Sequence, residues 1–177
     1  YFTDNHFCLC SREKERRLNF ETPDKYTELA DRLSRSIEKM MAWAGDDNLS
    51  NEFAIQGEYC GPGINGSGVY KNPLGLTERK FFVFNIYDIK RSRYLHTGFL
   101  PEYAELFGLE TVPFVYFWPK FEATLDQLLE LVKGKYDGTN NHREGFVIRP
   151  AVETYSNVLR GRLSFKVINN DYLLQEK

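Results

Sequence analysis

The chain has 177 residues and a mass of 20.7 kDa, which is the length of about one domain. Hydrophobic residues make up 42% and aromatic residues 15%, which excludes a disordered chain and allows an ordinary core. A net charge of −2 excludes a strongly basic protein, so binding to a nucleic acid would need a local basic patch or a second domain.

The first third of the chain predicts a short strand followed by a long helix. Residues 7–9 have the apolar, strand-like character of a β-strand. Thr22 is the expected helix cap, with a proline next to it in the first turn. Apolar side chains then recur every three or four residues over 26–44, and Gly45 ends the pattern. We expect the apolar stripe to be core packing.

The middle of the chain predicts three strands and one short helix. Residues 53–59 form a strand pattern, and the apolar run at 81–89 is the strongest strand pattern in the sequence. Residues 100–107 predict a helix that Gly108 ends, and residues 112–118 predict another strand.

The last third predicts a capped helix, a polar loop and two strands. Thr124 is the expected cap of the helix, the polar loop covers 134–143, and the strands cover 144–149 and 163–169. The expected buried side of the helix comprises Leu125, Leu128, Leu129, Leu131 and Val132. Because several strands are too close in sequence for helical crossovers, we expect an α+β fold with a largely antiparallel sheet.

The cysteines and the lack of apolar spans indicate where the protein works. Cys8, Cys10 and Cys60 are an odd and sparse set without a CxxC pair, which favours free thiols over disulfides or a zinc site. The sequence has no run of about 18 apolar residues and no signal-peptide pattern. We therefore expect a soluble protein, cytoplasmic or otherwise intracellular, with no membrane partner.

Two short motifs suggest nucleotide chemistry but occur in the wrong setting. Residues 61–66 fit GxGxxG, yet residues 68–73 show no helical period, whereas a dinucleotide site needs a helix to begin there. Lys135-Tyr136-Asp137-Gly138 fits the KxDG signature of covalent nucleotidyltransferases. Too few residues follow it to form the rest of such a site, and its polar surroundings predict an exposed turn.

Two charged residues stand at unusual places in the last two strands. Glu144 opens one strand and Lys166 lies inside the other. Lysine and glutamate are almost never fully buried unless they are paired. An acid and a base directed by neighbouring strands toward one cleft would form a site for a phosphate and its metal ion.

Five motifs in order carry a resemblance to a known family. They are Cys10-Ser11-Arg12, Gly57-Glu58-Tyr59-Cys60-Gly61-Pro62-Gly63, Phe82-Val83-Phe84-Asn85-Ile86, Glu144-Gly145-Phe146-Val147-Ile148-Arg149 and Ser164-Phe165-Lys166. From about residue 8 to about residue 173 the chain resembles an ATP-dependent RNA ligase of the RNA ligase 2-like nucleotidyltransferase family, in its Deinococcus-type branch. The resemblance implies an ATP-grasp-like ligase adenylation domain over residues 1–177, with largely antiparallel sheets flanked by helices.

The family's reaction gives the expected activity and partners. Its members join a 3′-hydroxyl to a 5′-phosphate through lysyl-AMP and polynucleotide-adenylate intermediates. The resemblance therefore implies ATP and Mg²⁺ or Mn²⁺ as cofactors. The expected partners are RNA ends or nicked RNA or RNA/DNA duplexes, bound by a protein that is expected to be a monomer.

The resemblance implies three catalytic residues. Lys166 would contact the α-phosphate, and Glu144 would hold the metal ion through the waters of that ion, since Mg²⁺ gives up its water reluctantly. Arg12 would bind the ribose or the donor phosphate. The alternatives are a lysine with a solvated head, a charge on an edge strand and a surface ion pair, respectively.

Three further residues are implied in binding the nucleotide. Glu58 would accept hydrogen bonds from the ribose hydroxyls, for which an ionised carboxylate is suited. Phe84 would stack on the adenine, and Val147 would cover its other face. The alternatives left open are a solvated strand end for Glu58 and plain core packing for Phe84.

The chain departs from the family pattern in two ways. Related ligases often carry a second lysine at the position of Ser164. In the family the nucleophilic KxDG lysine also precedes the motif at residues 10–12, so we expect it a few residues upstream of Tyr1. The Deinococcus-type branch also has an N-terminal OB-type domain for the polynucleotide, and its absence from this sequence would fit the net charge of −2. Two other functions stay open: a non-catalytic domain that binds nucleotides or RNA ends, and the core of a DNA ligase or capping enzyme.

Overall fold

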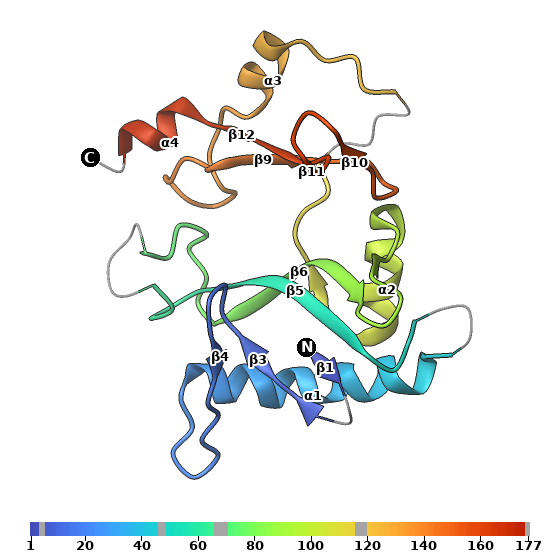
Figure 1. Cartoon of the computed structure of the whole chain (residues 1–177). Coiled ribbons are helices and arrows are strands. Elements are labelled where there is room, and N and C mark those ends of the chain that lie inside the picture. Colours follow the sequence, from blue (N-terminus) through green and yellow to red (C-terminus); the bar gives the residue numbers. More distant parts are fainter. Residues whose placement is uncertain (4–5, 46–48, 66–70, 116–119, 176–177) are drawn as a thin grey trace. The chain divides into compact units, whose positions relative to one another are not determined.

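The structure is a computed structural model that describes residues 1–3, 6–45, 49–65, 71–115 and 120–175 (Figure 1). The chain divides into two compact units. The first comprises Tyr1–Glu58 and Phe81–Val112, and the second comprises Tyr59–Lys80 and Pro113–Lys177. Helices and mainly antiparallel strands occur in the chain, which confirms the α+β prediction.

The first unit holds most of a six-stranded sheet. Its strands are β1 (Phe2–Thr3), β2 (His6–Phe7), β5 (Phe53–Cys60), β6 (Lys80–Asp88), β7 (Arg93–Tyr94) and β8 (Glu110–Thr111). The order is β2-β1-β5-β6-β7, and β8 pairs with β6 in parallel. A separate ribbon consists of β3 (Leu9–Cys10) and β4 (Glu15–Arg16). The strand predicted at 7–9 is thus divided at Cys8, which lies between β2 and β3.

Helix α1 (Lys25–Trp43) begins two residues later than its predicted cap suggests. Asp24 is the cap, and its carboxylate accepts hydrogen bonds from the backbone N–H groups of Tyr26 (3.0 Å) and Thr27 (2.9 Å). The hydroxyl of Thr22 instead accepts a hydrogen bond of 2.8 Å from Asn19. A single carboxylate oxygen that satisfies two free N–H groups is a strong cap.

The core of the first unit forms where the apolar side of α1 meets the sheet and α2 (Leu100–Phe107). A short 3₁₀ turn, η2 (Thr97–Phe99), precedes α2. The largest buried apolar side chains of this unit are Phe2, Leu29, Leu33, Ile37, Met40, Leu49, Phe53, Val83, Ile86, Leu100 and Phe107. As predicted, the Met and aromatic stripe of α1 is mostly core, and α2 ends at Gly108, whose φ of +71° suits glycine.

The second unit combines two strand pairs with two helices. Its elements are α3 (Leu125–Leu131), β9 (Gly145–Ile148), β10 (Tyr155–Ser156), β11 (Gly161–Arg162), β12 (Phe165–Ile168) and α4 (Asn170–Gln175). Strand β9 pairs with β12 and β10 pairs with β11, both antiparallel. Thr124 caps α3 in a capping box with Gln127, as the sequence predicts.

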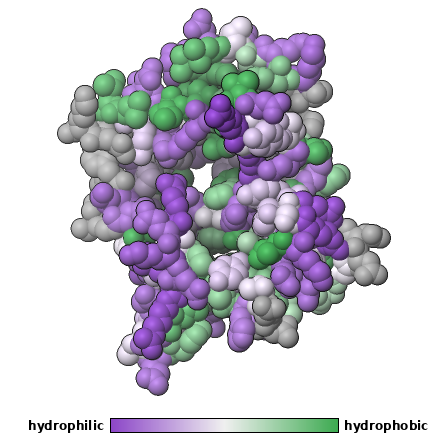
Figure 2. Space-filling model, viewed as in Figure 1, coloured by the Kyte–Doolittle hydropathy of each residue, from purple (hydrophilic) through white to green (hydrophobic). Residues whose placement is uncertain are grey.

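Three expectations for this region were wrong or incomplete. Residues 112–115 form no strand, because Pro113 lacks the N–H group that a ladder needs; residues 116–118 lie outside the described part. Leu125 is 68% exposed and does not belong to the buried side of α3. In agreement with this exposure, Figure 2 shows apolar surface over α3. The short elements β10, β11 and α4 were not predicted.

The remaining global expectations concern membranes and thiols. Within the described residues, no helix combines the length and the apolar character that crossing a bilayer requires. Cys8, Cys10 and Cys60 are free thiols, as the sequence predicts.

Asp88 is a fully buried carboxylate at the end of β6. It accepts hydrogen bonds from the Ser50 hydroxyl (2.6 Å) and backbone N–H (3.0 Å), and from the Arg91 guanidinium (2.7 Å) and backbone N–H (3.0 Å). Burial raises its pKa, but the hydrogen bonds from Ser50 and Arg91 outweigh burial and lower the pKa to about 2. Asp88 therefore holds the 50–52 segment and the turn after β6 together as a charged group.

We expect the contribution of Asp88 to stability to disappear in acid. The folded pKa is depressed, so the stabilisation is complete above about pH 4, the ordinary pKa of aspartate, and is lost as the pH falls through about 2. Asp88→Asn should lower the free energy of unfolding by about 1–3 kcal/mol at pH 7. Urea unfolding at several pH values measures this, with the exposed Asp31→Asn as control. An equal effect of Asp88→Asn at pH 7 and pH 2 would contradict the assignment.

Candidate functional site

The antiparallel pair β9–β12 has one buried face and one open face. Lys166 stands opposite Val147, and Val167 stands opposite Phe146. Phe146, Ile148 and Val167 pack against α3. Since successive side chains of a strand alternate between faces, Val147 and Lys166 lie on the open face. Val147 is accordingly 61% exposed.

Glu144 and Lys166 form an ion pair. Strict alternation would place Glu144 on the α3 side with Phe146, but Gly145 lies between them with a φ of +150°. An ideal Cβ atom at Gly145 would clash with the carbonyl oxygen of Val167. We attribute the departure from alternation to this glycine, which lets the carboxylate of Glu144 reach the open face. The structure thus brings together the acid and the base that the sequence singled out.

Arg143 ties the start of β9 to the end of α3. Its guanidinium donates hydrogen bonds to the carbonyls of Val132 (3.1 Å), Leu131 (3.4 Å) and Lys133. The same group lies 4.8 Å from the centre of the Phe146 ring. A cation at the C-terminus of a helix is favourable, because the last carbonyls have no partner within the helix. Arg143 was not among the residues predicted to form the site, since no local sequence pattern identifies the helix end that it reaches.

Arg12, Glu58 and Phe84 belong to the first unit. Arg12 is exposed in the bend after β3, and its side chain has no partner among the described residues. Glu58 is exposed near the end of β5, and Phe84 is half-buried in β6. Their side-chain roles stay predictions, because the structure describes each unit by itself.

The neighbouring strands β5 and β6 that carry Glu58 and Phe84 are closely fitted to each other. An ideal Cβ atom at Gly57 would lie 2.5 Å from the Phe81 ring and 2.6 Å from the carbonyl oxygen of Phe82. The amide of Asn85 donates a hydrogen bond of 2.9 Å to Gln56. Glycine at position 57 is therefore required by the close approach of the two strands.

The two motifs discounted from the sequence lie in turns. The KxDG match at 135–138 lies in a turn closed by a bridge between Lys135 and His142, with Gly138 at a φ of +69°. The described part of the glycine-rich loop, residues 61–65, is also a turn and contains no helix start; residues 66–70 lie outside the described part. Both observations agree with the loop predictions.

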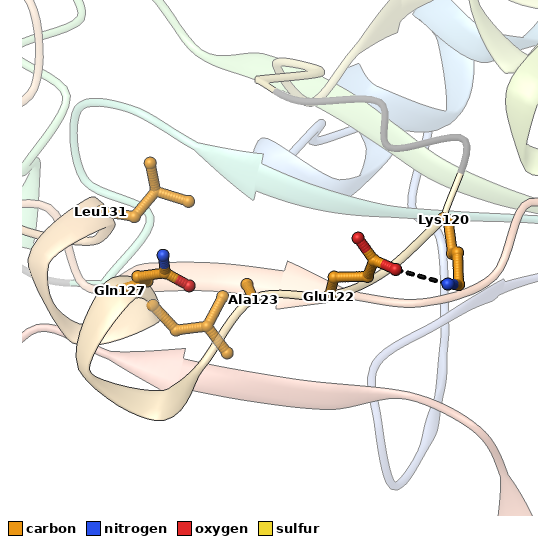
Figure 3. Close-up of a pocket in the computed structure, with 6 residues that line it drawn as sticks. Lys120, Glu122, Ala123, Gln127 and Leu131 are labelled. Carbon is orange, nitrogen blue, oxygen red and sulfur yellow. Dashed lines mark ion pairs between the residues drawn. The ribbon is translucent and has the colours of Figure 1, made fainter.

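A hollow of about 390 Å³ lies beside α3 (Figure 3). It is lined by Lys120, Glu122, Ala123, Gln127, Leu128 and Leu131. Lys120 and Glu122 pair with each other, and the Gln127 side chain serves the helix cap. The hollow thus contains none of the predicted site residues.

Few of the described side chains near Glu144 are suited to bind a metal ion. No cluster of three or more histidine, cysteine, aspartate or glutamate residues suited to a metal occurs among the described residues. Mg²⁺ is commonly bound through one or two carboxylates together with water and substrate phosphates. The half-exposed carboxylate of Glu144 fits a Mg²⁺ site that has a single protein carboxylate.

A family model described as RNA ligase matches residues 1–168. The chain belongs to the RNA ligase family. This match covers both units of the structure and confirms the family suggested by the motifs. A comparison with curated proteins gave no match.

Solved structures of a Naegleria gruberi RNA ligase are similar to this family member. An apo lysine-to-alanine variant is 28% identical with a TM-score of 0.74. Variants with ATP and Mn and with AMP and Mn are also 28% identical, with TM-scores of 0.73 and 0.74. Each comparison covers 99% of this chain and 47% of the Naegleria chain, so this chain spans about half the length of those proteins. The fold is therefore that of RNA ligases.

We expect Gly145→Ala to destabilise the second unit. The substitution forces an alanine to a φ of +150° and places its Cβ atom against the backbone of β12. Strain alone costs about 1–2 kcal/mol, and the clash with a carbonyl adds to it. Denaturant unfolding should show a loss above about 2 kcal/mol. Gly161→Ala is the control, because an added Cβ atom there would lie 3.8 Å from its nearest neighbour, the carbonyl oxygen of Leu159. Equal stability of the two variants would contradict the role of Gly145.

Proposed function

We propose that this chain is the nucleotidyltransferase domain of an ATP-dependent RNA ligase that joins a 3′-hydroxyl to a 5′-phosphate. The Glu144–Lys166 ion pair on the open face of β9–β12 is the observation that carries this proposal. Membership of the RNA ligase family supports it. The similar Naegleria structures with ATP and Mn support ATP and Mg²⁺ or Mn²⁺ as cofactors.

The ion pair has the chemistry that phosphoryl transfer needs. The ammonium of Lys166 pairs with the carboxylate of Glu144, and both side chains are partly exposed (39% and 45%). With ATP bound, Lys166 would donate to the α-phosphate, and Glu144 would hold the divalent cation. The cation would neutralise charge on the phosphate oxygens. A fixed ammonium beside the same phosphate stabilises the charge that develops there in the transition state.

The nucleoside contacts are assigned to the remaining predicted residues. Phe84 would stack on adenine and Val147 would cover the other face, for which the exposure of Val147 is suitable. Glu58 would accept hydrogen bonds from the ribose hydroxyls, and Arg12 would bind the ribose or donor phosphate. Glu58 and Arg12 are both exposed, as contact with a bound nucleotide requires.

The proposed reaction has three steps, each of which forms one bond at phosphorus and releases one leaving group. A lysine upstream of Tyr1 would attack the α-phosphorus of ATP, forming a P–N bond and releasing pyrophosphate. The 5′-phosphate of the polynucleotide would then attack the same phosphorus and free the lysine. The 3′-hydroxyl would finally attack the 5′-phosphate, form the phosphodiester and release AMP. The proposed substrates are RNA ends or nicked RNA or RNA/DNA duplexes, bound by a monomer.

We expect Glu144→Ala and Lys166→Ala each to slow adenylylation by about 10²-fold or more, as loss of a transition-state contact does. The test uses a protein that carries this chain with the segment preceding Tyr1, labelled ATP and Mn²⁺. The pair is partly exposed and contributes little to stability, so both variants should fold.

Lys135→Ala is the matched control for this experiment. It removes the lysine of the KxDG match in the 135–138 turn and should leave the rate unchanged. Rates of the Glu144 and Lys166 variants within tenfold of the parent would overturn the site assignment. Loss of the AMP adduct in Lys135→Ala would show that the nucleophile lies in this turn. Absence of any adduct in the parent would favour a non-catalytic binding domain.

A further inference from the structure

Asn169 is a nearly fully buried side chain (1% exposed) that directly follows β12. It lies three residues after Lys166 on the same segment. A buried amide must satisfy its donors and acceptor within the protein, because an unpaired polar group costs about 1–3 kcal/mol. Where those hydrogen bonds go therefore shows what the residue holds in place.

The hydrogen bonds of Asn169 converge on the backbone around Glu144. Its Nδ2 donates to the carbonyl oxygens of Arg143 (3.0 Å) and Gly134 (3.4 Å). Its backbone N–H donates to the carbonyl oxygen of Glu144 (2.9 Å). Its Oδ1 accepts from the backbone N–H of Asp171 (3.1 Å), at the start of α4. Two consecutive carbonyls, those of Arg143 and Glu144, thus depend on one residue.

Tyr136 completes the set of contacts to this peptide. Its hydroxyl oxygen accepts the backbone N–H of Glu144 at 3.3 Å. Three backbone groups around the Glu144 Cα atom therefore have partners in the same unit: the carbonyl of Arg143, and the N–H and carbonyl of Glu144. Fixing both peptide planes fixes the direction of the Cα–Cβ bond, and so limits where the carboxylate can lie. Asn169, directly after the strand of Lys166, supplies two of these three contacts, one through its side chain and one through its backbone N–H.

We propose that Asn169 is a positioning residue for the metal-binding carboxylate of Glu144. This inference rests on the proposed function, in which Glu144 holds the divalent cation. Asn169 acts through the backbone and touches neither nucleotide nor metal. Loss of its contacts would leave the nucleoside contacts intact and would loosen the carboxylate relative to the ammonium of Lys166. Outer partners of a metal ligand typically change metal affinity by about 10–100-fold.

The test compares Asn169→Ala with Asn141→Ala in a protein that carries this chain and the segment preceding Tyr1. Asn141 is a matched control, because it is also buried (9%) and its Nδ2 donates to the carbonyl of Pro73 (3.0 Å), away from Glu144. Mn²⁺ binding is measured by electron paramagnetic resonance with a non-hydrolysable ATP analogue. Binding of that analogue and the unfolding free energy are measured in parallel.

We expect Asn169→Ala to weaken Mn²⁺ binding by about 10–100-fold, with the adenine and ribose contacts unaffected. Asn141→Ala should lower stability without a change in Mn²⁺ binding above about threefold, since its side-chain hydrogen bond goes to Pro73 and not to the backbone around Glu144. Equal Mn²⁺ affinity of the two variants would overturn the positioning role and leave Asn169 as a fold residue.

Two further variants make the outcome decisive. If Asn169→Ala does not fold, Tyr136→Phe removes only the hydroxyl that accepts the Glu144 N–H, and should weaken Mn²⁺ binding in the same direction. Unchanged Mn²⁺ affinity in Tyr136→Phe would then overturn the proposal. Glu144→Ala tests the proposed function itself: if it leaves Mn²⁺ binding unchanged, Glu144 is not the metal ligand and both proposals are wrong. Weakened binding in Glu144→Ala and in the Asn169 or Tyr136 variant supports both.

Discussion

The packing of the β9–β12 pair against α3 is the constraint on which the candidate site depends. A ribbon of two strands is at best marginally stable alone, so the contact of Val167 with Leu128 and Val132 holds it in place. This contact also fixes the register, because a slip of one residue would turn Val167 outward and Lys166 into the core. The apolar face of the ribbon therefore determines that the charged face stays open.

The ion pair on that open face adds little to the stability of the fold. Exposed or half-exposed pairs contribute about 0–1 kcal/mol, because water screens them and side-chain entropy opposes them. The backbone around the pair is nevertheless held by buried groups, namely Arg143 at the end of α3 and Asn169 after β12. The backbone hydrogen bonds made by Arg143 and Asn169 therefore hold a site whose ion pair is itself weak. A weak pair can exchange its partners for a phosphate and a cation at little cost to the fold, which suits a binding site.

Local sequence signals predicted the elements that depend on local physics. Thr124 with Gln127 and the left-handed Gly108 fix helix ends through contacts within a few residues. The strand expected at 112–118 was wrong over 112–115, because apolar, β-branched composition says nothing about whether a ladder partner exists, and Pro113 prevents one. The meeting of Glu144 and Lys166 was expected from a charged residue in each of two neighbouring strands, whereas simple alternation argues against it. The φ of Gly145 decides this, and it cannot be read from one sequence.

The chemistry of Asn169 explains why an amide stands at this position. The side chain meets three backbone groups there: the carbonyls of Gly134 and Arg143 and the N–H of Asp171. An aspartate would direct an oxygen at two carbonyl oxygens, which is repulsive in a buried setting. A leucine of similar size would leave both carbonyls without this donor. A short side chain with an NH₂ group that can donate twice and an oxygen that can accept satisfies this arrangement, and it stands directly after the strand of Lys166. The Asn169 side chain thereby holds the carbonyl of Arg143, which belongs to the peptide that precedes Glu144, while the packing of Val167 sets the register of β12.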